Sequence, residues 1–275
     1  MRNYLVICIL MMMMLSTSTV RADYPIGKGR TAIIGTYNYY YSNKYFNDAG
    51  KIVNYAAGDN FQSHGMSINF AHGIGRNVDI ILSVPFAIQN FTGSGIKSNN
   101  AGLTDINMGL SFHFPSVNYQ KYFTIKVNGI IPAYSNQDST KPFLGYASKG
   151  ASIALNYSFS PFNDGFAIVE AAYTRFFDNV DGPNQYRINA SLSKMLNQNT
   201  SLNFSFAHQI SQSDNISFNP NFSVNKNFSG GTLSVGLSKR ITRTITPAVS
   251  AFYTLYGKNL GLGVGANFTL IVRMP

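Results

Sequence analysis

Charged and titratable side chains are scarce in this 275-residue sequence, and six of them lie in segments that could bring them onto one common face. These candidates are Asp79, Asp105, His113, Lys126, Glu170 and Arg187. Their spacing matches no metal-ligand pattern. No histidine of the chain is followed two residues later by serine, the spacing that would place a histidine–serine couple on one face of a strand. We therefore expect these side chains to act through charge and hydrogen bonding, with no metal, no cofactor and no catalytic role.

The candidate residues belong to segments in which apolar and polar residues alternate. In 104–114 the even positions are all apolar from residue 106 onward, whereas Asp105 and His113 stand among the odd, polar or small ones. Segments 78–89 and 260–272 repeat the pattern. A period of two predicts a β-strand with one face on apolar and the other on polar surroundings. Runs of about 9–13 residues suit a tilted membrane strand better than a strand of a water-soluble protein.

The same reasoning along the whole chain predicts twelve strands. Their expected ranges are 31–41, 63–72, 78–90, 104–114, 121–132, 150–159, 166–177, 186–195, 200–209, 230–238, 245–256 and 260–272. Pro85 falls inside one of these strands and lacks the N–H group that a strand ladder needs, so a β-bulge is expected there.

The connections between these strands alternate in length. The long ones are 42–62, 91–103, 133–149, 178–185 and 210–229, and the short ones are 73–77, 115–120, 160–165, 196–199 and 239–244. Bacterial barrels have short periplasmic turns and longer external loops. The sequence therefore predicts an all-β, antiparallel up-and-down transmembrane barrel of about twelve strands with both termini in the periplasm. The last loop, 257–259, is an exception, because it is short and external.

Composition supports a membrane barrel. Charged residues make up 12% of the chain, about half of the usual ~25%. No apolar stretch after Ala22 is long enough to form a spanning helix, so a closed barrel is the way to cross a bilayer. Aromatic residues are expected at the two headgroup levels. One belt would contain Tyr37, Tyr39, Phe177, Tyr186 and Tyr253, and the other Phe114, Phe123, Phe159 and Phe166.

The N-terminal residues 1–22 have the features of a cleaved signal peptide. A single early cation, Arg2, precedes an apolar run at 5–15, and Ala22 ends a stretch that a signal peptidase could cut. Cleavage would remove Cys8, which excludes disulfide and thiolate chemistry from the mature barrel of residues 23–275. It would also lower the net charge from +10 to about +8 by removing Arg2 and Arg21. The remaining cations are scattered, so nucleic-acid binding is not expected.

The inward faces of the predicted strands carry mostly small polar residues, which suits a hydrated interior. Lys126 and Glu170 reach similar depths at about 3.3 Å of rise per residue. They could create a transverse field across a narrow passage, or they could pair and help to fill the barrel. Asp79 and His113 are expected to form a hydrogen-bonded pair at one end. The alternating glycines Gly261, Gly263 and Gly265 are interpreted as small lumen-side residues, because no helix follows them to form a phosphate loop.

At 102–112 the sequence Gly-Leu-Thr-Asp-Ile-Asn-Met-Gly-Leu-Ser-Phe resembles a phrase common in outer-membrane barrels of the family named for the MetA-pathway of phenol degradation. Two further phrases, at 83–86 and 128–132, are similar to the same family, and the resemblance covers roughly residues 70–160. It implies a barrel without catalytic residues and suggests small solutes, hydrophobic or aromatic ones among them. The chain departs from many proteobacterial barrels by ending on Met274-Pro275 rather than on an aromatic residue.

The leading hypothesis is a channel or facilitator of the bacterial outer membrane that passes small solutes passively. One alternative is a structural or surface-interaction barrel with a filled lumen, and a less favoured one is a lipid-modifying barrel enzyme. The expected partners are outer-membrane lipid, a small solute and the outer-membrane assembly machinery.

Overall fold

The computed structural model describes residues 25–93, 96–136, 138, 140–177, 182–214 and 225–275. The signal peptide expected at 1–22 lies outside these residues. The strands are β1 (Thr31–Phe46), β2 (Ile52–Asn54), β3 (Asn60–Gly73), β4 (Val78–Gly93), β5 (Ile96–Leu103), β6 (Asp105–Pro115), β7 (Tyr122–Pro132), β8 (Gly150–Phe159), β9 (Gly165–Phe176), β10 (Asn184–Met195), β11 (Thr200–Gln212), β12 (Phe228–Lys239), β13 (Ile245–Lys258) and β14 (Leu260–Met274). Within the described residues, no helix is long and apolar enough to cross a membrane.

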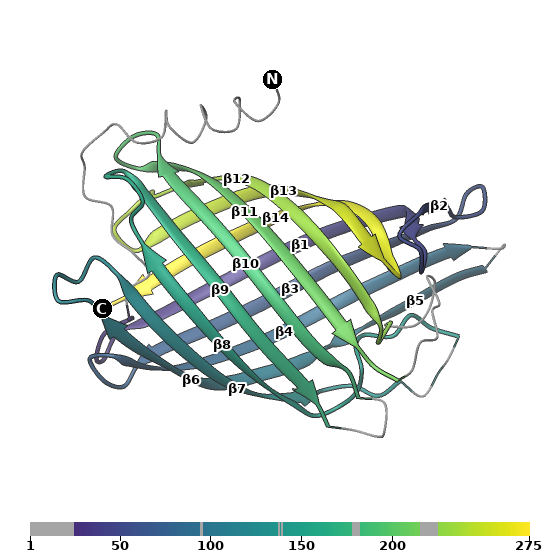
Figure 1. Cartoon of the computed structure of the whole chain (residues 1–275), viewed down its shortest axis with the longest axis horizontal. Coiled ribbons are helices and arrows are strands. Elements are labelled where there is room, and N and C mark those ends of the chain that lie inside the picture. Colours follow the sequence, from purple (N-terminus) through teal and green to yellow (C-terminus); the bar gives the residue numbers. More distant parts are fainter. Residues whose placement is uncertain (1–24, 94–95, 137, 139, 178–181, 215–224) are drawn as a thin grey trace.

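Twelve of these strands form a closed antiparallel barrel (Figure 1). Each pairs with its neighbour along the chain, and β14 closes the ring against β1 from Thr31–Met274 to Phe46–Leu260. The short strands β2 and β5 lie outside the ring and pair with β1 and β4. The predicted fold class and strand number are therefore confirmed. In a closed ring every strand has a neighbour on both sides, so the backbone N–H and C=O groups are hydrogen-bonded. The apolar core of a bilayer requires this, because it holds no water to bond them.

The segment 91–103 was predicted as a loop, and the structure corrects this. β4 continues to Gly93 and pairs back onto β5, from Phe86–Leu103 to Gly93–Ile96. The alternation fades in this hairpin because it extends beyond the apolar band, where both faces can be polar. The first loop, 42–62, likewise contains the end of β1 and the whole of β2.

The irregularity expected at Pro85 is present. The β4 register shifts by one residue between Ser83–Asn107 and Phe86–Leu103. The backbone N–H of Thr104 donates to the carbonyl of Pro85 at 2.9 Å. The extra residue on the β5–β6 side is a bulge that accommodates the proline.

The barrel has an apolar exterior. Ile80, Leu110 and Val264 are exposed on the outer face, whereas their neighbours Asp79 and Ser111 are buried on the inner face. Aromatic residues occur at both ends of the outer face, as expected; one example is Phe114 and Phe123, with ring centroids 6.4 Å apart. Phe166 is a correction to this belt, because it pairs with Ser193 on the lumen-facing side of β10.

Candidate functional site

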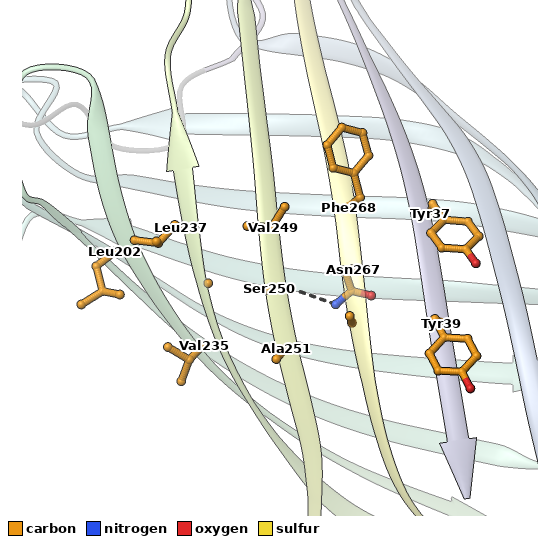
Figure 2. Close-up of a pocket in the computed structure, with 12 residues that line it drawn as sticks. Tyr37, Tyr39, Leu202, Val235, Leu237, Val249, Ser250, Ala251, Asn267 and Phe268 are labelled. Atoms are coloured by element: carbon orange, nitrogen blue, oxygen red, sulfur yellow. Dashed lines mark hydrogen bonds between the residues drawn. The ribbon is translucent and has the colours of Figure 1, made fainter.

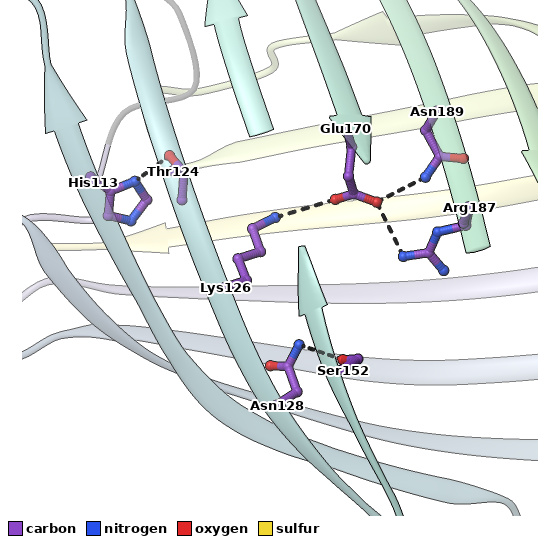
Figure 3. Close-up of polar contacts among 8 residues, drawn as sticks. All are labelled: His113, Thr124, Lys126, Asn128, Ser152, Glu170, Arg187 and Asn189. Atoms are coloured by element: carbon purple, nitrogen blue, oxygen red, sulfur yellow. Dashed lines mark hydrogen bonds and ion pairs between the residues drawn. The ribbon is translucent and has the colours of Figure 1, made fainter. Parts of the chain in front are cut away.

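The inner wall is lined by small polar side chains that bond to one another across strands. Asn267 Nδ2 on β14 donates to Ser250 Oγ on β13 at 3.1 Å, and Asn38 on β1 donates to Asn267. Asn128 Nδ2 on β7 donates to Ser152 Oγ on β8 at 3.2 Å (Figure 3). Such cross-strand pairs satisfy the polar groups while keeping them close to the wall.

A charged cluster crosses four consecutive strands, β7 to β10. Glu170 Oε1 accepts hydrogen bonds from Arg187 Nη2 at 3.1 Å and Asn189 Nδ2 at 2.9 Å. Glu170 Oε2 lies 3.9 Å from Lys126 Nζ (Figure 3). Asn156 on β8 joins the pair when its amide is oriented to donate to Glu170 and accept from Lys126, both at 2.9 Å. We call Lys126, Asn156, Glu170, Arg187 and Asn189 the charged cluster.

Of the two roles considered for Lys126 and Glu170, the geometry favours pairing. The two residues lie on one wall with only β8 between their strands, and therefore do not face each other across the lumen. The side chains of Lys126 and Arg187 are 29% and 49% exposed, whereas that of Glu170 is 15% exposed. Two accessible cations surround one covered carboxylate, so the cluster presents positive charge to the interior.

Asp79 and His113 form the expected pair near the short turns. His113 Nε2 lies 2.9 Å from Asp79 Oδ2, and His113 Nδ1 lies 3.0 Å from Thr124 Oγ1. The backbone N–H of Ile26 donates to Asp79 Oδ2 at 3.1 Å. Both ring nitrogens are thereby occupied by neighbours in a buried setting, an arrangement that positions the N-terminal segment against the wall.

Asp105 lies at the opposite end, where the long loops begin. Tyr134 OH donates to Asp105 Oδ1 at 3.1 Å and accepts from the N–H of Ala147 at 2.9 Å. Burial raises the pKa of the Tyr134 phenol well above its ordinary value. The hydroxyl therefore stays protonated and ties two parts of the loop 133–149 to the wall. The structure brings Asp105 to this loop rather than to the charged cluster.

The loop 133–149 lies across the mouth of the barrel. Asn100 Nδ2 on β5 donates to the carbonyl of Pro142 at 2.8 Å. On the other side, Tyr146 OH donates to the carbonyl of Asn225 at 3.0 Å and accepts from Gln185 Nε2 at 2.9 Å. Burial raises the pKa of Tyr146 to about 12. These anchors come from β5, β10 and the connection before β12, so the described part of the loop is fixed to strands on both sides of β7 and β8.

An aromatic cluster inside the mouth was not predicted. Tyr40 on β1 stacks on Phe252 of β13 with ring centroids 6.3 Å apart, and Phe61 meets Tyr40 edge-on at 6.1 Å. A Cβ at Gly263 would lie 2.0 Å from the Tyr40 ring, and one at Gly265 would lie 2.3 Å from the Phe252 ring. These lumen-side glycines thus leave room for rings that lie flat on the wall. Their alternation in the sequence indicated small residues, but not which rings cover them.

A hollow of about 630 Å³ lies on the outside of the barrel (Figure 2). Tyr37, Tyr39 and Phe268 line one part of it, and aliphatic side chains of β11 to β13 line the other. Ala251 and Ala266 form its floor on the outward face. Because most of the lining side chains belong to the apolar exterior, the hollow faces the bilayer.

No family model matches this chain. No curated protein matches it either. Among solved structures it is similar to the COG4313 outer membrane channel from Pseudomonas putida F1, with a TM-score of 0.74 and 12% identity over 90% of this chain and 96% of that one. The translocator domain of autotransporter NalP from Neisseria meningitidis has a TM-score of 0.53 and 10% identity, with 90% and 89% covered. The NanC porin has a TM-score of 0.53 and 8% identity, with 88% and 100% covered. At these identities, the comparisons establish an outer-membrane barrel fold.

Proposed function

We propose that the protein is a passive channel of the bacterial outer membrane that admits small solutes through the barrel interior. The observation that carries this proposal is the inner wall, where small polar side chains surround two accessible cations, Lys126 and Arg187. Ser205, which faces inward beside Ser191 and Ser234, is exposed to the interior. A wall of this kind suits passage through water. The similar fold of the COG4313 outer membrane channel supports the same role.

The preferred solutes of this channel are small molecules that combine an aromatic or hydrophobic part with a negative charge. The rings of Tyr40, Phe61 and Phe252 offer a stacking surface inside the mouth. The charged cluster offers net positive charge on the wall between β7 and β10. The resemblance to barrels named for phenol degradation agrees with aromatic solutes.

Two alternatives receive less support. A structural barrel with a filled lumen would bury its inward side chains, whereas Ser205 and Arg187 remain exposed. A lipid-modifying enzyme needs an activated nucleophile that its substrate can reach, whereas His113, Asp79 and Thr124 are all buried. The exposed inner wall and this burial support transport rather than catalysis.

The N-terminal sequence and the barrel fold support a proposal for the biogenesis of the channel. We propose export with cleavage of residues 1–22, insertion by the outer-membrane assembly machinery and residence among outer-membrane lipids. No nucleic acid or cofactor takes part in this proposal.

Conductance in planar bilayers tests the channel directly, using refolded protein whose closed barrel is verified by heat-modifiable gel migration. We expect discrete conductance steps with a preference for anions. In liposome swelling, benzoate should enter faster than lysine. Benzoate is an aromatic anion, whereas lysine carries a net positive charge and no ring. Folded protein that gives no conductance would reject the channel and favour the filled barrel.

A further inference from the structure

Positive charge is concentrated at the end of the barrel that carries the short turns and both ends of the described chain. We call nine residues there the basic rim: Lys28, Arg30, Arg76, Lys121, Lys194, Lys239, Arg240, Arg243 and Arg273. Among the described residues at this end, the acids are Asp164 and Asp79, and Asp79 is buried against His113. The Asp79 carboxylate is engaged by His113 rather than by a cation of the rim.

The opposite end has a different balance. Its cations are Lys44, Lys51, Lys97, Lys141, Lys149, Arg175, Lys226 and Lys258, and its described acids are Asp48, Asp59, Asp105, Asp138 and Asp214. One of these pairs is a salt bridge, with Lys141 Nζ 3.3 Å from Asp138 Oδ2. Among the described side chains, nine cations face two acids at the short-turn end and eight face five at the other, so the net positive charge is greater at the short-turn end.

The short turns also expose large apolar side chains. Ile74, Val117, Leu196 and Ile241 occupy four of the five turns and are 47%, 101%, 55% and 64% exposed, respectively. Turn tips in water normally use small or polar residues. Here, exposed apolar side chains at the tips of the turns stand beside cationic side chains. This amphipathic pattern is typical of segments that lie in a membrane interface.

The position of the tips relative to the lipid agrees with an interfacial role. Phe114 and Phe123 form part of the aromatic belt, and Val117 lies three residues beyond Phe114. Three residues span about 10 Å of strand, or about 7 Å along the bilayer normal at the usual tilt. The headgroup layer on each side of the hydrocarbon is about 5–8 Å thick. Val117 therefore falls within the headgroup layer, and the other short turns lie at the same end of the barrel.

We propose that the basic rim and the four apolar turn tips bind anionic phospholipid at the periplasmic leaflet, with the phosphates on the cations and the tips against the acyl boundary. The leaflet is set by the short turns, which are expected in the periplasm. Charge complementarity selects the ligand, because a cationic surface with few acids attracts anionic headgroups.

Two arginines of the rim are held in place by neighbouring turns. Arg240 Nη2 donates to the carbonyl of Gln198 at 2.9 Å and to Asn199 Oδ1 at 3.3 Å. Arg76 Nη2 donates to Tyr119 OH at 2.7 Å, and its guanidinium lies 5.6 Å from the centre of the Tyr119 ring. A guanidinium has five N–H donors, so these contacts fix its position and leave donors for a phosphate.

Lipid binding to the folded full-length barrel can be measured by native mass spectrometry in detergent, with phosphatidylglycerol compared against phosphatidylcholine. We expect the wild type to bind phosphatidylglycerol at least about tenfold more tightly, since each cation near an anionic surface contributes about fivefold. Glycerol phosphate, which has the anion without acyl chains, serves as a third probe and should bind far more weakly than the lipid.

In the variant with Lys239→Gln, Arg240→Gln and Arg243→Gln, the affinity for phosphatidylglycerol relative to phosphatidylcholine should fall by at least about tenfold. A matched control with Lys51→Gln, Lys97→Gln and Lys258→Gln removes the same charge from the other end and should keep the preference. Ile241→Ser with Val117→Ser should weaken binding of both lipids. The proposal is wrong if the wild type shows no preference, if the rim variant keeps it while folded, or if glycerol phosphate binds as well as the lipid.

Discussion

At the scale of single residues, exposure determines which charge of a pair a solute meets. Glu170 is surrounded by donors from Lys126, Arg187 and Asn189 and is largely covered, whereas the two cations reach the interior. A covered carboxylate holds the cations in position, and the accessible cations generate the field that a passing ion feels. Fixed charges at a narrow point of a pore set its ion selectivity.

Removing one cation of the charged cluster should therefore reduce anion selectivity. For Lys126→Gln and Arg187→Gln, we expect the permeability ratio of anions to cations to fall by about twofold or more, with the barrel still folded. The reversal potential in a salt gradient measures this ratio. Lys97→Gln, at the outer hairpin, is the control and should leave it unchanged. Unaltered selectivity in both cluster variants would place the constriction elsewhere.

At the scale of elements, each strand has one face toward lipid and one toward the barrel interior. Apolar and polar side chains therefore alternate along its sequence. Leu110 on β6 faces outward among exposed apolar residues, and Ser205 on β11 faces the interior. A charge is costly only on the lipid side, where neither water nor a partner solvates it.

Leu110→Arg should destabilise the barrel by about 2–4 kcal/mol, because residue 110 lies near the middle of the apolar band. Ser205→Arg should cost much less, because the new cation can extend into water inside the barrel. Urea titration of the protein refolded in liposomes measures both free energies of unfolding. Equal losses would contradict the assignment of inner and outer faces.

At the scale of the whole molecule, a ring of twelve strands does not by itself determine whether the interior is open to solutes or filled by side chains. Barrels of about eight strands are filled by side chains, and those of 16–18 strands leave an aqueous channel. In this barrel the loop 133–149 is anchored at the long-loop end by contacts with Asp105, Asn100 and Asn225. We therefore expect the width of the entrance to depend on this loop as well as on the ring of strands.

Replacing residues 138–144 by a short Gly-Ser linker should raise the single-channel conductance, because Pro142 and its contact with β5 are removed. Tyr134→Phe should produce a smaller rise by releasing the hydrogen bond to Asp105. The barrel strands are untouched, so the thermal stability should change little. Conductance equal to that of the wild type in the loop replacement would show that the loop does not limit passage.

The sequence by itself determined the twelve strands of the ring, their two faces, its closure and the gathering of the long connections at one end of the barrel. These properties are local: alternation follows directly from contact with lipid on one face and water on the other, and connection length is read along the chain. The expected bulge at Pro85 was also correct, because a missing N–H is a property of one residue. The hairpin formed by β5 was missed, because alternation carries no signal where both faces are polar.

Apart from the Asp79–His113 pair, only the tertiary structure decided which side chains make contact inside the barrel. Tyr40 lies over Gly263, and Tyr146 bonds to Asn225, although each pair is far apart in the sequence. Lys126 and Glu170 share one wall because their strands are separated only by β8, and the residue levels are set by strand register. These contacts depend on the register between strands and on how a loop folds back, neither of which is encoded in the local pattern of polarity.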